Sequence, residues 1–131
     1  MFLDANIFIH AFRDKDAHEA RACRQLLRKV ANGEQRVVTS PLVAEEVLHY
    51  FMEKKGRLFA LRVLRSISGQ PNLAMLQVDE RALSLAPEFI EAGLGSADAL
   101  HAAVMKANGE MTICSFDRGF DNAPGIRRKE P

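Results

Sequence analysis

Short apolar segments alternate with longer amphipathic segments along the chain, and this alternation constrains the fold most. Runs of about four to eight apolar residues are typical of buried strands, whereas apolar residues spaced three and four apart are typical of helices. The pattern predicts strands at 2–3, 36–39, 73–78 and 111–115, and a weakly marked terminal strand at 126–128. It predicts helices at 16–32, 41–55, 56–68, 80–92 and 97–107. Short strands separated by helices form parallel sheets covered on both faces, so an α/β fold is expected.

The ends of several predicted helices carry residues that favour starting or stopping a helix. Ser40 followed by Pro41 is typical of a capped helix start, and Ser96 is expected to cap the helix after it. Gly33 and the pair Asn108–Gly109 are expected to end helices, because glycine often follows the last helical residue.

The composition is that of an ordinary globular domain. The chain has 131 residues, of which 47% are hydrophobic and 27% charged, and it contains no repeat or linker. We therefore expect one domain over residues 1–131. No apolar run is long enough for a membrane span, and the N-terminus lacks a secretory signal, so a cytoplasmic protein without a membrane partner is expected. Cys23 and Cys114 have no metal or disulfide spacing and are expected to be buried, reduced thiols.

The charges nearly balance, with 18 basic and 17 acidic residues, so the chain lacks the strongly basic character of many nucleic-acid-binding proteins. They are nevertheless segregated, since no acid lies between Glu53 and Asp79. The basic residues at 54–65 leave two interpretations open, a solvated helix face or a phosphate-binding patch, whereas those at 21–28 are interpreted as a solvated face. The segment 55–67 also carries more apolar residues than one helix face needs, which is typical of a partner or dimer surface.

Four acids stand near the carboxyl ends of predicted strands, where open α/β sheets place their functional residues: Asp4 ends the first strand, Asp117 follows the fourth, Asp98 is in the first turn of a helix and Glu46 is in the helix after the second strand. Asp4 lies among apolar residues and carries a desolvation cost unless it is paired or bound to metal. Asp98 and Asp117 have simpler alternatives, a helix-start acid and a turn residue. Glu46 borders the apolar face of its helix, whereas Glu45 points away from it.

Several carboxylates in one pocket repel one another unless a cation lies among them. Oxygen ligands of this kind suit Mg²⁺ or Mn²⁺. A metal in such a site polarises a phosphate and activates a bound water, which is the chemistry of phosphoryl transfer. No catalytic triad, phosphate-binding glycine loop or dinucleotide motif in the sequence offers a competing mechanism.

Four segments together resemble the PIN-domain nucleases, in particular the VapC-type toxins. They are LDANIFI at 3–9, SPLVAEEV at 40–47, SADALHAA at 96–103 and ICSFDRGFD at 113–121. The resemblance implies a three-layer α/β/α sandwich with a mainly parallel central sheet. It also implies Mg²⁺- or Mn²⁺-dependent endoribonuclease activity that leaves 5′-phosphate and 3′-hydroxyl ends. The matching metal-binding and catalytic residues are Asp4, Glu46, Asp98 and Asp117, with Asn6, Ser115 and Asp121 in supporting positions.

The same resemblance implies partners for the protein. VapC-type toxins act on RNA, form homodimers and are held inactive by an antitoxin protein, so these three partners are expected here.

Three alternatives remain open from the sequence. The first is a PIN-like RNA-processing nuclease outside a toxin system, and the second is a PIN-like protein that binds RNA without cutting it. The third is a receiver-like phosphoacceptor domain, for which Asp79 stands after the third strand, although Asp4 has no adjacent acid. Asp79 is otherwise interpreted as a helix-start acid, and His101 as a packing or surface residue.

Overall fold

Five short strands form one parallel sheet in this computed structural model, which describes residues 1–13 and 17–131. They are β1 (Phe2–Leu3), β2 (Val37–Thr39), β3 (Leu73–Met75), β4 (Thr112–Cys114) and β5 (Arg127–Lys129). The order is β3-β2-β1-β4-β5, with every pairing parallel. Receiver domains have the order 2-1-3-4-5 instead, so the receiver-like alternative is wrong.

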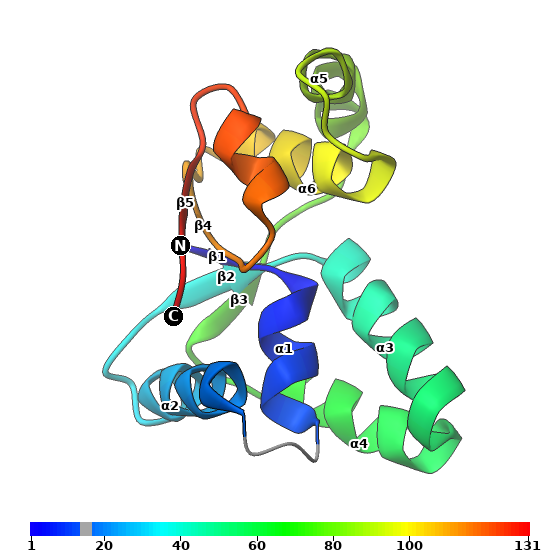
Figure 1. Ribbon diagram of the computed structural model, residues 1–131, viewed down its shortest axis with the longest axis vertical. Helices are drawn as coiled ribbons and strands as arrows, with labels where there is room; N and C mark the ends of the chain where they lie inside the picture. Colours follow the sequence, from blue (N-terminus) through cyan, green and yellow to red (C-terminus); the bar gives the residue numbers. More distant parts are fainter. Residues whose placement is uncertain (14–16) are drawn as a thin grey trace.

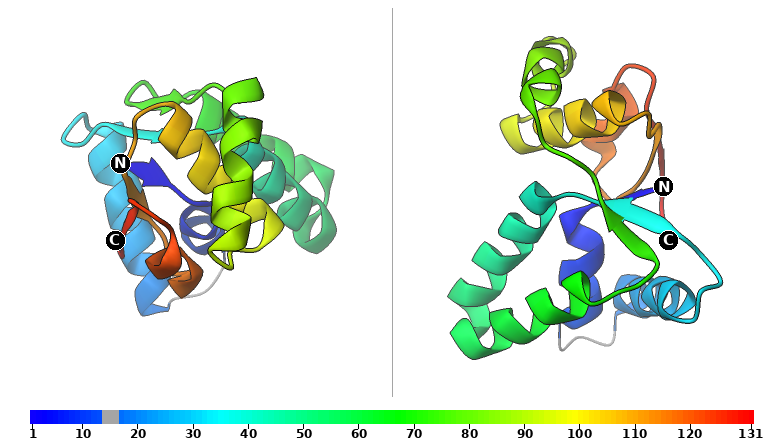
Figure 2. Two further views of the ribbon diagram at one scale, coloured as in Figure 1. Left: turned by 90° about the horizontal axis from the view of Figure 1, so that it is seen from above. Right: turned by 180° about the vertical axis from the view of Figure 1, so that it is seen from behind.

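Helices cover both faces of this sheet. They are α1 (Ala5–Phe12), α2 (His18–Ala31), α3 (Pro41–Lys55), α4 (Arg57–Ser68), α5 (Glu80–Glu91), α6 (Ser96–Ala107) and the 3₁₀ helix η1 (Arg118–Asn122). Helices α1 to α4 lie on one face, and α5, α6 and η1 lie on the other (Figures 1 and 2). The predicted α/β/α sandwich is therefore confirmed.

The predicted strand at 73–78 is too long, and the helix expected at 16–32 begins later. Strand β3 ends at Met75, because its partner β2 ends at Thr39 where the chain turns into α3. Helix α2 begins at His18, and residue 16 lies outside the described residues. The weakly marked terminal strand is confirmed, one residue later than predicted.

Helix α1 was not predicted, because its apolar residues follow β1 without any intervening turn residue. Asp4 makes this direct passage from strand to helix feasible. It is the N-cap residue of α1, and its Oδ1 accepts a hydrogen bond of 2.7 Å from the Ala5 amide. The helix then buries Ile7 and Phe8 against the sheet and its neighbours.

Two of the predicted caps are confirmed and one is wrong. Ser40 accepts a hydrogen bond from the Val43 amide, and Asp79 accepts one from the Ala82 amide. Ser96 does not cap α6. The Ala99 amide donates to the Gly95 carbonyl at 2.8 Å, so the helix starts one residue earlier and Gly95 takes the cap position.

The core consists of aromatic and aliphatic side chains on both faces of the sheet. The largest fully buried side chains include Phe2, Phe51, Phe89 and Phe120. Three alanines of α6 (Ala99, Ala102 and Ala103) are completely buried, so this helix approaches the sheet closely. Both cysteines are buried and unpaired, as predicted. Burial raises the pKa of the Cys23 thiol to about 12 and that of Cys114 to about 11, so neither is reactive at neutral pH.

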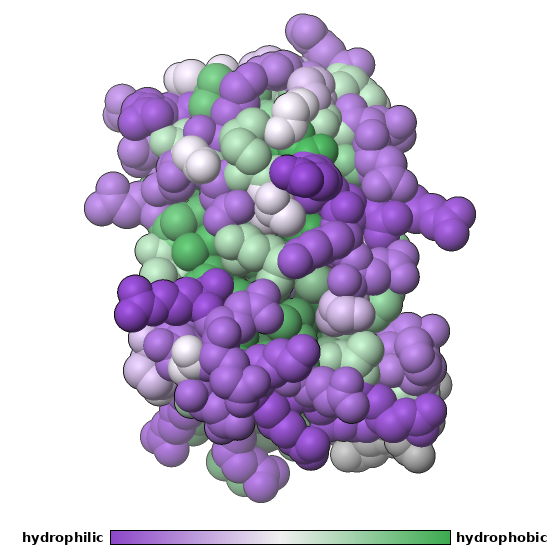
Figure 3. Space-filling view, turned by 90° about the vertical axis from the view of Figure 1, so that its left-hand side faces the viewer, coloured by the Kyte–Doolittle hydropathy of each residue, from purple (hydrophilic) through white to green (hydrophobic). Residues whose placement is uncertain are grey.

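The sheet ends on one side in β5, whose three residues Arg127–Lys129 are all basic. A charged edge strand discourages pairing with the edge of another sheet. Figure 3 looks onto this side of the molecule and shows a mostly hydrophilic surface with smaller hydrophobic areas between the charged groups. Within the described residues, no helix has the length and apolar character needed to cross a membrane.

Candidate active site

The site is built where β1 and β4 lie side by side in the centre of the sheet. The order of the strands reverses here, and α/β proteins bind ligands at the carboxyl edge of such a point. Leu3 pairs with Cys114 in the parallel register, so the next residues, Asp4 and Ser115, emerge as neighbours. The Ser115 hydroxyl donates a hydrogen bond of 2.6 Å to Oδ2 of Asp4.

Asp4 is held in place by several hydrogen bonds. The Asn6 amide donates to Oδ2 of Asp4 at 2.6 Å and to the Ser115 hydroxyl at 2.9 Å, so the three side chains form a closed triangle. Asp4 is only 5% exposed. Burial raises the pKa of this carboxyl, while the Ser115 hydrogen bond opposes the increase. The ionised form of Asp4 is therefore less favourable here than it would be in water.

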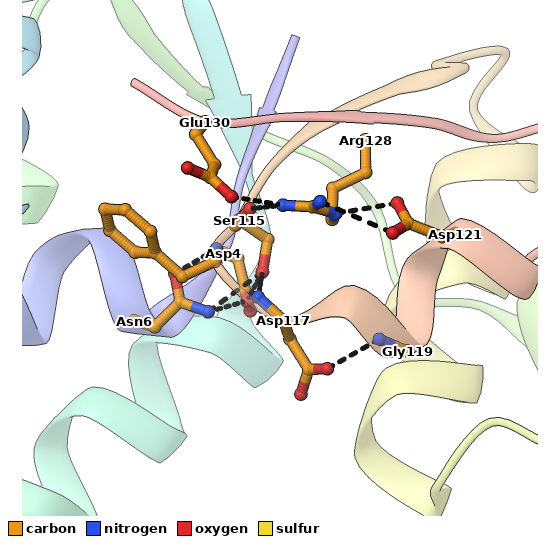
Figure 4. Close-up of polar contacts among 9 residues, drawn as sticks. Asp4, Asn6, Ser115, Asp117, Gly119, Asp121, Arg128 and Glu130 are labelled. Atoms are coloured by element: carbon orange, nitrogen blue, oxygen red, sulfur yellow. Dashed lines mark hydrogen bonds and ion pairs between the residues drawn. The ribbon is translucent and has the colours of Figure 1, made fainter.

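The same two supporting residues fix the loop that carries Asp117 (Figure 4). The Ser115 hydroxyl accepts a hydrogen bond from the Asp117 amide at 2.9 Å, and the Asn6 carbonyl oxygen accepts one from Phe116 at 3.4 Å. Oδ1 of Asp117 accepts from the Gly119 amide at 2.7 Å. The structure thus places Asn6 and Ser115 between the first and fourth predicted acids.

Asp98 approaches this group from α6. A Cβ atom at Gly119 would lie 3.1 Å from Oδ1 of Asp117 and 3.9 Å from Oδ2 of Asp98, so the two carboxylates border one small space. Burial raises the pKa of Asp98 to about 6, with further contributions from the charges of Asp117 and Asp4. The charge of Glu46 also raises the pKa values of Asp4 and Asp98, so all four predicted acids belong to one electrostatically coupled group.

Glu46 reaches the site from the other helical layer. It lies on α3, its side chain is 47% exposed, and its Oε2 lies 3.3 Å from Nε2 of His101 on α6. His101 is only 2% exposed, so it is a packing residue and not a surface residue. Its contact with Glu46 was not predicted from the sequence. The available signal was its position three residues after Asp98, which places both on neighbouring parts of the helix surface.

Asp121, by contrast, does not face the other acids. Nε and Nη2 of Arg128 donate to its two carboxylate oxygens at 2.7 and 3.3 Å, and Figure 4 shows this pair away from Asp117. The Arg128 hydrogen bond lowers the pKa of Asp121. Nη1 of Arg128 also donates to the Ser115 carbonyl at 3.0 Å and to Glu130 at 3.0 Å. Arg128 was not predicted as a structural link in the site, because the sequence marks it only as part of a basic cluster.

Replacing Arg128 with methionine is expected to lower the melting temperature by about 4 °C, because the Ser115 carbonyl loses a charged donor. Asp121→Asn, which leaves that bond intact, should cost less than half as much. Since Arg128 lowers the Asp121 pKa, the Asp121 contribution is present at neutral pH and disappears below about pH 4. Thermal unfolding at pH 7 and pH 3.5 measures both effects. Equal losses in the two variants at pH 7 would contradict the role of the Ser115 contact.

The donor set fits a hard divalent cation. Asp4, Asp98, Asp117 and Glu46 offer carboxylate oxygens, which Mg²⁺ and Mn²⁺ prefer. Burial keeps the pKa values of Asp4 and Asp98 above normal, and a cation among these acids would relieve that cost. In the part of the chain that the structure describes, no three His, Cys, Asp or Glu side chains already stand in a metal-holding arrangement.

Comparison with known proteins agrees with this architecture. Residues 1–126 match the family model described as PIN domain. A VapC ribonuclease of Mycobacterium bovis and ribonuclease VapC13 of Mycobacterium tuberculosis are each 31% identical to the chain over 130 residues, which cover 98% of both sequences.

Solved structures show the same fold at lower identity. VapC20 of Mycobacterium tuberculosis, described as a sarcin-ricin loop cleaving toxin, superposes with a TM-score of 0.78 at 19% identity, covering 99% of this chain and 98% of that one. VapBC2 of Rickettsia felis, bound to a DNA fragment from its promoter, gives a TM-score of 0.72 at 18% identity, with coverages of 98% and 96%. The chain belongs to the PIN domain family, in which VapC ribonucleases are its homologues.

Proposed function

We propose that this chain is a metal-dependent endoribonuclease of the VapC type, acting as a single domain over residues 1–131 and as the toxin of a toxin–antitoxin pair. The observation that carries the proposal is the buried Asp4, held by Asn6 and Ser115 beside Asp98 and Asp117 at the strand-order reversal. The two ribonucleases that match at 31% identity over 98% of the chain support RNA as the substrate.

In this proposal Asp4, Asp98, Asp117 and Glu46 hold Mg²⁺ or Mn²⁺. When bound, the metal would polarise the scissile phosphate and activate the attacking water. Asn6 and Ser115 keep Oδ2 of Asp4 hydrogen-bonded, whereas Oδ1 accepts, among the described residues, from the Ala5 amide alone, which leaves Oδ1 with a lone pair for a ligand. The half-exposed Glu46 would bind metal or orient the water, and the products would carry 5′-phosphate and 3′-hydroxyl ends.

Two surfaces support protein partners. A groove of about 380 Å³ runs between α1, α2 and α4, with Phe12 and Leu27 among its apolar lining and Arg24 and Arg28 beside them. It would accept an apolar, acidic segment of an antitoxin, the partner that the resemblance to the VapC-type toxins implies. On the α3–α4 side, Leu58 is 79% exposed, which supports a homodimer contact.

The exposed basic residues of the α3–α4 segment support a role in positioning RNA. They are Lys54, Lys55, Arg57, Arg62 and Arg65, and all are exposed. Phosphate contacts of this kind orient a nucleic acid without reading its sequence.

The test is an RNA-cleavage assay with the wild-type chain in Mn²⁺ buffer, with Asp4→Asn as the matched variant. We expect the wild type to cut structured RNA into fragments with 5′-phosphates, which a ligase that requires that end will join. Asp4→Asn should remain folded and cut at least about 100-fold more slowly. RNA binding without cleavage by the wild type would refute the nuclease proposal and favour a non-cutting binder. A toxin is distinguished from an RNA-processing nuclease by a second assay, in which the product of the adjacent gene is added. Inhibition of RNA cleavage by that protein would identify a toxin.

A further inference from the structure

His101 connects the two helical layers of the molecule at the carboxyl edge of the sheet. It lies on α6, on the face covered by α5, α6 and η1, whereas Glu46 lies on α3 on the opposite face (Figure 1). Their side chains meet with 3.3 Å between Nε2 of His101 and Oε2 of Glu46, although 55 positions separate them in the sequence. This contact brings an acid from the α3 layer toward the acids on the other side.

The histidine ring is fixed in position and in its hydrogen-bonding direction. It is 2% exposed and lies against the Phe2 ring, with 6.0 Å between ring centroids. Its Nδ1 is buried and has no hydrogen-bond partner within the described residues. A hydrogen on Nδ1 would be an unpaired buried donor, whereas a hydrogen on Nε2 points at Glu46. The surroundings therefore favour the tautomer that donates to Glu46.

Within the described residues, the Glu46 carboxylate contacts a single hydrogen-bonding group, His101, whereas Asp4 is held by several donors. Asp4 is held by three donors, and Asp117 is tied to its loop by the Gly119 amide. The Glu46 side chain is long, 47% exposed and rooted on the surface of α3, so without a donor it would sample many rotamers. His101 supplies the donor that selects one of them.

The same imidazole also lies close to the rest of the site. His101 interacts electrostatically with both Asp4 and Asp98, so its ring lies near these two carboxyls as well. The donor that holds Glu46 thus stands beside two further acids of the group.

A purely structural histidine would be expected to satisfy its buried polar atoms or to be replaceable by an apolar side chain. Here one nitrogen remains unpaired in the interior, a cost that native proteins tolerate mainly where a polar group has another role. We infer that His101 is a positioning residue for Glu46, holding this carboxylate toward Asp4 and Asp98 by its Nε2 hydrogen bond. The inference rests on the proposed nuclease function.

The first experiment compares two substitutions of similar size in the full chain. His101→Gln keeps an N–H donor at nearly the same reach, whereas His101→Met keeps the volume and removes the donor. We expect His101→Met to lower kcat for RNA by about 10- to 100-fold with little change in KM, and His101→Gln to recover to within about 5-fold of wild type. Mn²⁺ affinity, measured by electron paramagnetic resonance without RNA, should fall in His101→Met and return in His101→Gln.

The second experiment tests whether His101 acts through Glu46. In a Glu46→Ala background, adding His101→Met should change kcat and Mn²⁺ affinity by less than about 2-fold, because alanine has no side-chain oxygen for His101 to hold. The inference would be overturned if the Glu46 and His101 substitutions acted independently, so that their separate losses multiplied in the double variant. It would also be overturned if His101→Met and His101→Gln behaved alike. If the wild type failed to cleave RNA, the proposed function would fall, while the Mn²⁺ affinities would still decide the role of His101.

Discussion

Asp98→Asn is expected to reduce RNA cleavage by about 1,000-fold and, at the same time, to make the metal-free protein more stable. The loss of activity follows because asparagine cannot supply a negatively charged ligand. The gain in stability follows because burial, with help from Asp117 and Asp4, raises the Asp98 pKa to about 6, so ionisation of this side chain opposes folding at neutral pH. Allowing for its partial exposure, the relief is about 1 kcal/mol, or about 3 °C in melting temperature.

The stability difference between Asp98→Asn and the wild type is expected to depend on pH. A carboxyl whose folded pKa is raised favours the folded state when protonated, and this contribution is lost as pH rises through about 6. The variant should therefore match the wild type near pH 4 and exceed it increasingly up to neutral pH, measured by thermal unfolding in EDTA.

Asp79→Asn is the matched control, since Asp79 is an exposed cap of α5 and asparagine caps helices equally well. It should change neither activity nor melting temperature. An Asp98→Asn protein with full activity would remove Asp98 from the proposed site.

Removing divalent metal is expected to stop cleavage completely and to lower the melting temperature. A ligand that binds only the folded state at 100 times its Kd adds about 2.7 kcal/mol, which corresponds to about 8 °C for a chain of this size. The physical source is the relief of repulsion among the carboxylates at the carboxyl edge of β1 and β4. The measurement is a melting curve and an RNA-cleavage rate in EDTA, followed by titration with Mn²⁺.

The control for this prediction is the double variant Asp98→Asn with Asp117→Asn. It should show the same melting temperature with and without Mn²⁺, because two of the four proposed ligands are gone. Undiminished cleavage by the wild type in excess EDTA would exclude a metal-dependent mechanism.

Much of the fold could be predicted because local signals agree with the tertiary structure. The pair Ser40–Pro41 starts α3 with a side-chain cap and a first-turn proline, as predicted, and the weakly marked terminal strand forms as β5, one residue later than predicted. Two of the wrong predictions depend on tertiary contacts or on a cap that the local pattern does not show. Strand β3 ends at Met75 because its partner β2 ends at Thr39. Helix α1 follows β1 without a turn because Asp4 caps it.

The site was predictable only in part for a related reason. The four acids of the proposed site were predicted from the family resemblance and from their places near the carboxyl ends of the strands. Their connections could not be predicted, because Arg128 reaches back from β5 to the Ser115 carbonyl and His101 reaches across the sheet edge to α3. Asp121 illustrates the limit, since the resemblance gives it a supporting position in the site, whereas its carboxylate is bound by Arg128 on β5.

The triangle of Asp4, Asn6 and Ser115 also determines when during synthesis this protein can become active. Asp4 and Ser115 are 111 positions apart, so the first acid leaves the ribosome long before the hydroxyl that holds it. At about 5–20 residues per second, the growing chain spends roughly 6–22 s without Ser115 or Asp117. A nascent chain that still lacks Ser115 and Asp117 therefore cannot form this triangle, and the proposed site is complete only after β4 and the loop behind it have been synthesised.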